Sequence, residues 1–205
     1  MTILLPPGAK PVTRLWETAC AVRTIDLAPI AFNQMPTGTR SPGPQCQTIP
    51  LDTVIENAGA LRKEFMTAVI DLSAYGLQGG IVTHSDINED LRKTFNAPAV
   101  PDLDLSVEVW REGYEVPQDC ADSEMVGWCF INATKPRHED SGSISVLDPR
   151  AGSEGTAMPG LPWGREYMFR PTPGLMAVVP GWLTSTVRPV EDGQTVVVVV
   201  AHVAT

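Results

Sequence analysis

The sequence predicts a mainly β fold with flanking helices, and three observations support this. Thr195 to Val203 contains five consecutive valines, and a run of β-branched residues favours an extended strand. Leu175 to Val179 is a second apolar run, and Pro180-Gly181 separates it from an extended stretch at Thr184 to Val187. The 19 prolines and 17 glycines among 205 residues favour many turns over long helices.

The composition is typical of one globular domain, and we expect a single domain over residues 1–205. The net charge of −9 argues against a nucleic-acid partner, because phosphate binding needs basic patches. Residues 1–10 lack the basic start and the long apolar core of a signal peptide, and no apolar run reaches membrane-spanning length. We therefore expect a cytoplasmic protein without a membrane partner.

The four cysteines contain no C-x-x-C pair, so a zinc site is not expected. Free buried thiols in a reducing compartment are the simplest interpretation of these residues. They are Cys20, Cys46, Cys120 and Cys129.

The N-terminal third combines strands, a loop and a helix. Residues 11–27 predict an opening pair of strands, although their apolar spacing also fits a helical turn. Ala28 to Pro50 is rich in Pro, Gly, Thr and Ser, which predicts a long surface loop. From Thr53 to Leu72 the apolar residues recur at helical spacing, which predicts one amphipathic helix packed on the back of the sheet. Asp52 is its expected N-cap.

The middle of the chain returns to extended structure. Ile87 to Phe95 predicts a short helix, which the prolines after it end. Leu103 to Trp110 alternates apolar and polar residues with a period of two and predicts a strand. Ala151 to Gly164 is a Gly- and Pro-rich loop, and Glu166 to Phe169 begins another strand.

Several segments resemble members of the Fe(II)/2-oxoglutarate oxygenase family. Pro180-Gly181-Trp182-Leu183 resembles the start of the family's P-S/G-W-L-x-H-x-V-x-P segment, and Ser141 to Arg150 resembles S-G-x-I-x-F-x-D-P-R. Met125 to Ile131 resembles its L-S-G-V-Y-Y-V strand, and the Gly79-Gly80 pair resembles its S-N-x-G-G segment. The resemblance runs from this glycine pair to the end of the chain. It implies a double-stranded β-helix (a cupin-like jelly roll) whose usual cofactors are Fe(II) and 2-oxoglutarate.

The residues that the resemblance assigns to the iron centre are replaced in this chain. The family's H-x-H/D pair falls at Gln118 and Cys120, with Asp119 between them. The second histidine position is Ser185, and the arginine that holds 2-oxoglutarate falls at or beside Gln194. A mononuclear Fe(II) oxygenase site needs two imidazoles and one carboxylate. The resemblance therefore implies a kept scaffold that has lost its metal and its cofactors.

The three histidines do not restore the missing ligands. His84 lies beside Ser85 and Asp86, so it is the metal ligand to consider if the iron site is displaced, although bonding to backbone is the simpler interpretation. His138 lies in an expected hairpin turn exposed to solvent. His202 is near the end of the valine strand, where a core or rim position is expected.

The candidate catalytic residues are Gln118, Asp119, Cys120 and Ser185. Cys120 is a nucleophile only if a nearby base favours its thiolate, and no base can be assigned, so an inert thiol stays the alternative. Ser185 lies between Thr184 and Thr186, where hydroxyl groups either bind a ligand or simply fill a strand.

The candidate ligand-binding residues are Trp128, Arg150, Trp182, Arg188 and Gln194. The two tryptophans provide aromatic walls for an apolar or flat ligand, or else they pack in the core. The two arginines are candidate anion contacts because a guanidinium fork matches a carboxylate. Arg188 is alternatively expected to pair with Glu191 across the turn.

Three hypotheses follow. The first is a degenerate oxygenase-like barrel, a pseudoenzyme with respect to iron chemistry, that binds a small-molecule ligand without cofactors. A metal-free cyclisation, isomerisation or dehydration is then a suitable reaction. The alternative is an Fe(II)/2-oxoglutarate-dependent dioxygenase with displaced ligands, using His84 with Asp86 or Asp119. The third is a structural protein, a homo-oligomer or part of an assembly, whose valine-rich edge strands add to a partner.

Overall fold

The structure is a computed structural model that describes residues 12–15, 18–33, 35, 45–78, 102–147, 149 and 166–204. The helices are α1 (Leu51–Val54) and α2 (Gly59–Gln78). The strands are β1 (Val12–Leu15), β2 (Thr18–Thr24), β3 (Cys46–Pro50), β4 (Asp102–Arg111), β5 (Val116–Asp119), β6 (Met125–Ala133), β7 (Ile144–Val146), β8 (Tyr167–Phe169), β9 (Leu175–Pro180), β10 (Ser185–Val187) and β11 (Thr195–Ala204).

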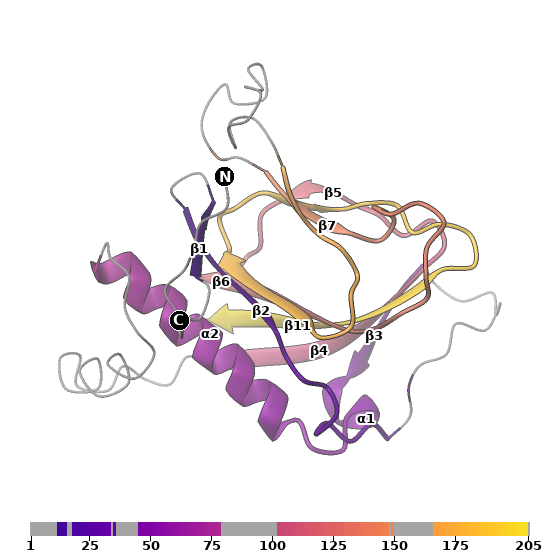
Figure 1. The fold of residues 1–205 in the computed structure, drawn as a ribbon, viewed down its shortest axis with the longest axis horizontal. Coiled ribbons are helices and arrows are strands. Elements are labelled where there is room, and N and C mark those ends of the chain that lie inside the picture. Colours follow the sequence, from indigo (N-terminus) through magenta and orange to yellow (C-terminus); the bar gives the residue numbers. More distant parts are fainter. Residues whose placement is uncertain are drawn as a thin grey trace.

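The strands form two facing antiparallel sheets. The large sheet has the order β1-β2-β9-β6-β11-β4-β3, and the small sheet has the order β5-β10-β7-β8. From β4 onward the chain passes repeatedly between them, so that β4-β11-β6-β9 faces β5-β10-β7-β8. This is the strand arrangement of a double-stranded β-helix, and the predicted jelly roll is confirmed. Figure 1 shows the small sheet above the large one, with α2 on the side of the large sheet away from β5 and β7.

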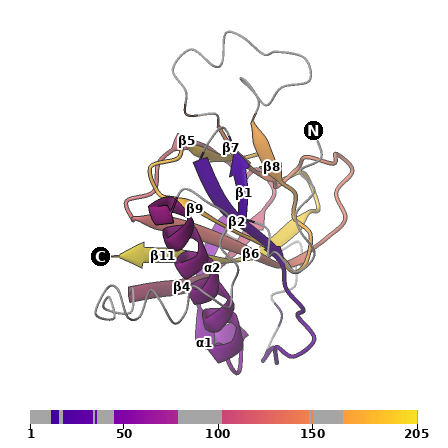
Figure 2. The same cartoon turned by 60° about the vertical axis from the view of Figure 1, so that its left-hand side comes forward.

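The central strands of the large sheet are buried on both faces, and β11 shows this most clearly. Val197 and Val199 belong to the core under α2, whereas Val196, Val198 and Val200 belong to the core between the two sheets. Since side chains alternate along a strand, a strand in this position is apolar throughout. The run of five valines therefore reflects two cores that share one wall. Figure 2 shows α2 crossing in front of this sheet.

The predicted strands are confirmed where they carry alternating or continuous apolar patterns. The opening pair is the β1–β2 hairpin, and the alternating stretch is β4. The apolar run, the break at Pro180-Gly181 and the extended stretch after it are β9, a turn and β10. Glu166 to Phe169 ends in β8, which is three residues long.

The prediction of one helix from Thr53 to Leu72 is wrong in its first part. α1 ends at Val54, and Ile55 is extended (φ −117°, ψ 120°) because it bridges to Phe32. α2 then begins at Gly59, whose N–H donates to Oδ1 of Asn57 at 3.0 Å. A long-range bridge and a second cap thus interrupt a pattern that is continuous in sequence.

Asp52 is not the N-cap of this region, contrary to the prediction. The N-cap position of α1 is Pro50, and Asp52 lies exposed in the first turn. The expected packing of the helix is confirmed, because Leu61, Phe65 and Val69 of α2 are buried against the large sheet.

The segment from Ala28 to Pro50 is not entirely a loop. Cys46 to Pro50 is the edge strand β3, which pairs with β4 from Cys46↔Trp110 to Pro50↔Ser106. Its own sequence is too short and too polar to predict a strand, so the pairing with β4 decides its conformation.

Some predictions lie outside the described residues. They concern the Gly79-Gly80 pair, His84, the helix from Ile87 to Phe95, Arg150 and the loop from Ala151 to Gly164. Among the helices that the structure describes, none has the length and apolar character needed to cross a membrane.

Gly127 of β6 is required by the close packing of α2 on the large sheet. A Cβ at this position would lie 2.9 Å from Cε1 of Phe65 and 3.0 Å from Cγ2 of Val178. Phe65 is fully buried, so its ring has little room to move.

We predict that Gly127→Ala lowers the free energy of unfolding by about 1–3 kcal/mol, because overpacking a dense core forces side chains apart. Urea denaturation measures this change. In a Phe65→Leu background the same substitution should cost about 1 kcal/mol less, since the ring it meets is gone. An unchanged denaturation midpoint for Gly127→Ala would contradict this packing.

Candidate functional site

The predicted catalytic positions meet at one end of the barrel. β10 pairs with β5 so that Ser185 lies opposite Asp119, with an irregular register between Ser185 and Val187. Directly opposed residues in an antiparallel pair have Cα atoms about 4.5–5.5 Å apart. Gln118 and Cys120 flank Asp119 and are exposed. The positions that the resemblance assigns to the iron ligands therefore lie on neighbouring strands, but side chains alternate along a strand, so Asp119, and not Gln118 or Cys120, shares a face with Ser185.

The turn between β9 and β10 is held tightly against the loop after β5. The N–H of Gly181 donates to the carbonyl of Glu124 at 2.8 Å, and the carbonyl of Gly181 accepts from the N–H of Ala121 at 2.9 Å. A Cβ on Gly181 would lie 1.8 Å from the carbonyl oxygen of Ser123, so only glycine fits. This turn therefore gives the barrel end a rigid rim.

An exposed thiol and an exposed aromatic ring lie together on this rim. The Cys120 thiol donates to the carbonyl of Trp182 at 3.3 Å, and its sulfur is 3.6 Å from Oγ1 of Thr184. Asp119 accepts the N–H of Cys120 through Oδ1 at 2.8 Å. The Trp182 residue is 58% exposed. We call Asp119, Cys120, Trp182, Thr184 and Ser185 the rim cluster.

Trp128 does not belong to the rim cluster. It is buried in the core between the sheets together with Trp110 and Phe130. Of the two interpretations for the tryptophans, core packing holds for Trp128 and exposure at the barrel end holds for Trp182.

Gln194 is part of a buried hydrogen-bond network. Its Oε1 accepts from the Ser141 hydroxyl and from the N–H of Glu191 at 3.3 Å, and its Nε2 donates to the Ser141 carbonyl at 3.1 Å. These bonds occupy the amide and tie the turn before β11 to the segment before β7. Gln194 is uncharged and already bonded, so it does not replace an arginine that would hold a 2-oxoglutarate carboxylate.

The donor set at the barrel end does not fit an Fe(II) site of the oxygenase type. Gln118, Asp119, Cys120 and Ser185 offer an amide, one carboxylate, a thiol and a hydroxyl, whereas the iron site needs two imidazoles with the carboxylate. Within the ranges that the structure describes, no group of three or more His, Cys, Asp or Glu residues could hold a metal ion.

The two described histidines have other surroundings. His138 is exposed, as predicted, and its N–H donates to Glu191 at 3.2 Å. His202 is also exposed, with Nδ1 3.3 Å from the Ser123 hydroxyl, which in turn donates to the carbonyl of Met125.

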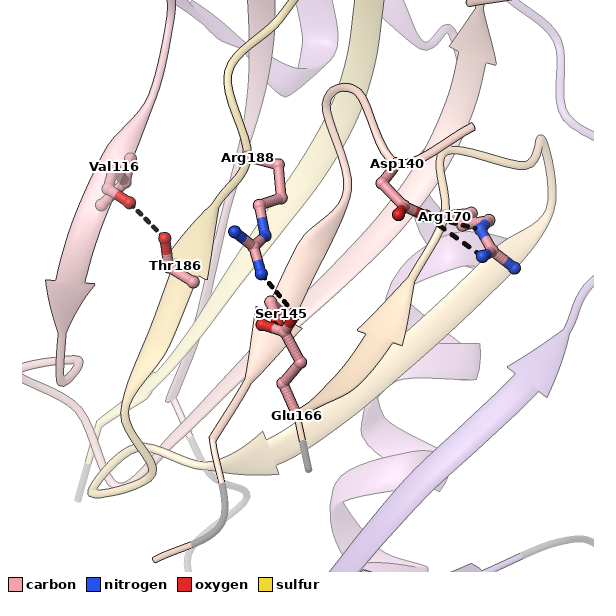
Figure 3. Close-up of polar contacts among 7 residues, drawn as sticks. All are labelled: Val116, Asp140, Ser145, Glu166, Arg170, Thr186 and Arg188. Carbon is pink, nitrogen blue, oxygen red and sulfur yellow. Dashed lines mark hydrogen bonds and ion pairs between the residues drawn. The ribbon is translucent and has the colours of Figure 1, made fainter. Parts of the chain in front are cut away.

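The outer face of the small sheet carries a polar cluster that the sequence did not reveal. Glu166 accepts from Nη2 of Arg188 and from the hydroxyl of Ser145, and Thr186 donates to the carbonyl of Val116 at 2.7 Å (Figure 3). The pairing of Arg188 with Glu191 is therefore wrong, and Glu166 is the partner. The alternation of polar and apolar residues in β7 and β10 indicates that one face of the small sheet is polar. It does not indicate that Glu166, which lies outside these two strands, is the partner of Arg188.

Glu191 and Arg170 each have partners of their own. Glu191 accepts the backbone N–H groups of Arg137 and His138. Arg170 pairs with Asp140 at 3.1 Å (Figure 3). It also pairs with Glu139 at 3.3 Å. These ion pairs are exposed and contribute little to stability.

Three of the four cysteines are kept neutral by burial. Burial raises the pKa of Cys20 and of Cys129 to about 12. Burial and then the Glu108 carboxylate raise the pKa of Cys46 to about 11, and burial likewise raises the pKa of its neighbour Tyr114. Cys120 is exposed, so the expectation that all four thiols are buried is wrong at this position.

We predict that a disulfide reagent modifies Cys120 rapidly and the other three thiols slowly at about pH 8. A raised pKa lowers the thiolate fraction, which for Cys46 is roughly 0.1% at that pH. The absorbance of the released thiol should show that one equivalent of cysteine reacts rapidly in the folded protein. All four cysteines should react after unfolding. Cys120→Ser should remove the fast phase, and a fast phase that persists in this variant would contradict the assignment.

No family model matches the chain, and no curated protein sequence matches it. Among solved structures, a Pseudomonas putida prolyl-4-hydroxylase is similar at 11% identity and a TM-score of 0.44, covering 78% of this chain and 71% of that one. An oxidoreductase of the 2OG-Fe(II) oxygenase family from Burkholderia pseudomallei matches at 14% identity and a TM-score of 0.35, covering 61% and 60%. A cupin domain from Bordetella pertussis matches at 12% identity and a TM-score of 0.31, covering 50% and 82%. These identities and TM-scores carry no information on activity. The assignment of the jelly-roll fold is based on the strand topology described above.

Proposed function

We propose that this chain is a jelly-roll protein that binds a small molecule at the rim cluster and uses neither Fe(II) nor 2-oxoglutarate. The observation that carries the proposal is the pairing of Ser185 with Asp119 at the end of β5. The resemblance assigns the iron of the oxygenases to this end of the barrel, and the side chains of the two paired residues here are a hydroxyl and a carboxylate without an imidazole group. The scaffold is kept and its donor chemistry is different.

The rim cluster offers suitable contacts for a flat or apolar ligand. Trp182 presents an exposed ring on a turn that Gly181 fixes to the neighbouring loop, and an aromatic face of this kind stacks on planar groups. The Cys120 thiol and the Thr184 hydroxyl lie beside it and supply polar contacts. Asp119 adds a carboxylate, so a metal-free isomerisation or dehydration has a proton acceptor at hand.

We predict that the purified protein binds Fe(II) and 2-oxoglutarate too weakly to form a complex, because its donor set lacks imidazoles. Anaerobic titration should show no metal-to-ligand charge-transfer band, and aerobic incubation should yield no succinate.

A charge-transfer band with the natural chain would overturn the proposal and favour a displaced iron site.

We also predict that Trp182→Ala leaves the free energy of unfolding within about 0.5 kcal/mol of the natural value, because the side chain is mostly exposed. Trp128→Ala, the matched control in the core, should lower it by about 3–5 kcal/mol. Chemical denaturation of both variants makes the comparison. A large loss for Trp182→Ala would mean that this ring stabilises the fold and is not available to a ligand.

A further inference from the structure

A pocket lies on the opposite side of the large sheet from the rim cluster. It has a volume of about 570 Å³ and lies between the end of β2, the residues after it and the first turns of α2. This volume is within the range of small-molecule sites, about 300–1,000 Å³. Its walls combine apolar Ile25 and Pro29 with four charged residues, namely Arg23, Asp26, Lys63 and Glu64.

Arg23 is the most deeply buried of these charged groups. It is 8% exposed, and its Nη2 donates to Asp71 of α2, which is also buried. Within the described chain its Nη1 is buried without a hydrogen-bond partner, and the carboxylate of Glu64 is 3.8 Å away. Native structures rarely leave a buried donor unsatisfied. An acceptor oxygen from a ligand that draws Glu64 away from this loose ion pair would therefore complete the guanidinium.

The charges around the pocket select the ligand class. Arg23 and Lys63 are cationic, and Asp26 and Glu64 are anionic. A simple anion would meet both carboxylates, and a simple cation would meet both basic groups. A ligand that carries one charge of each sign satisfies both pairs, and an apolar group on it would contact Ile25 and Pro29.

We propose that this pocket binds a free α-amino acid with an apolar side chain. The carboxylate of the amino acid accepts from Arg23 and Lys63, and its ammonium group donates to Asp26 and Glu64. The side chain of the ligand packs on the apolar wall. The site is independent of the rim cluster, because the large sheet and its two cores separate them.

Isothermal titration calorimetry with three matched probes tests the proposal. L-leucine carries both charges, 4-methylpentanoate lacks the ammonium group and 3-methylbutylamine lacks the carboxylate. We expect saturable binding of L-leucine and at least about tenfold weaker binding of each analogue, since each loses its charge-assisted hydrogen bonds. Equal binding of L-leucine and 4-methylpentanoate, or no saturable heat with L-leucine up to about 10 mM, overturns the proposal.

Isosteric variants test the contacts one by one. Asp26→Asn keeps the side-chain oxygen that accepts the N–H of Ala28, and Glu64→Gln keeps the shape of a half-exposed side chain. Each should weaken L-leucine binding by about tenfold without weakening 4-methylpentanoate binding. Arg23→Lys keeps a cation for Asp71 and removes the Nη1 donor. It should therefore weaken the binding of both L-leucine and 4-methylpentanoate.

Two further results separate this site from the rim cluster and from misfolding. Cys120→Ser should leave L-leucine binding unchanged, and a loss of binding in this variant would contradict the location. If Arg23→Lys does not fold, the Asp26→Asn and Glu64→Gln results decide, and unchanged L-leucine affinity in both overturns the proposal.

Discussion

The burial of β11 on both faces is the constraint on which the rest of the structure depends. Its alternate valines contribute to two separate apolar cores, one beneath α2 and one between the sheets. Each fully buried valine contributes roughly 1.5–3 kcal/mol of hydrophobic stabilisation. Because β11 also pairs with β4 along its whole length and with β6 over most of it, it joins the helix, the large sheet and the barrel into one unit.

This organisation makes the fold independent of the chemistry at the barrel end. The core between the sheets is filled by apolar and aromatic side chains, including Trp110, Trp128 and Phe130. Among the residues that the structure describes, Gln118, Cys120 and Ser185 are not part of this core. A jelly roll can therefore keep its pairing of β5 with β10 while it changes the groups that this pairing brings together.

The two candidate sites differ in how their charged groups are held. At the rim, Asp119 and Cys120 are exposed and are positioned by backbone contacts to a rigid turn. Behind the large sheet, Arg23 and Asp71 form a buried ion pair, which is expensive to desolvate and is weak evidence for stability alone. Such a pair does fix the orientation of α2 on the sheet, and it places a guanidinium beside a pocket.

The sequence by itself determined the strands and the apolar face of the main helix, because alternation and helical spacing report which side chains can be buried. The resemblance indicated Gln118, Cys120 and Ser185 as one set of positions, whereas the strand register puts Asp119 directly opposite Ser185. Only the tertiary structure decided the break at Ile55, the strand at Cys46 to Pro50 and the pairing of Arg188 with Glu166. Each of these depends on a partner distant in the chain, and local patterns carry no information on which partner is near.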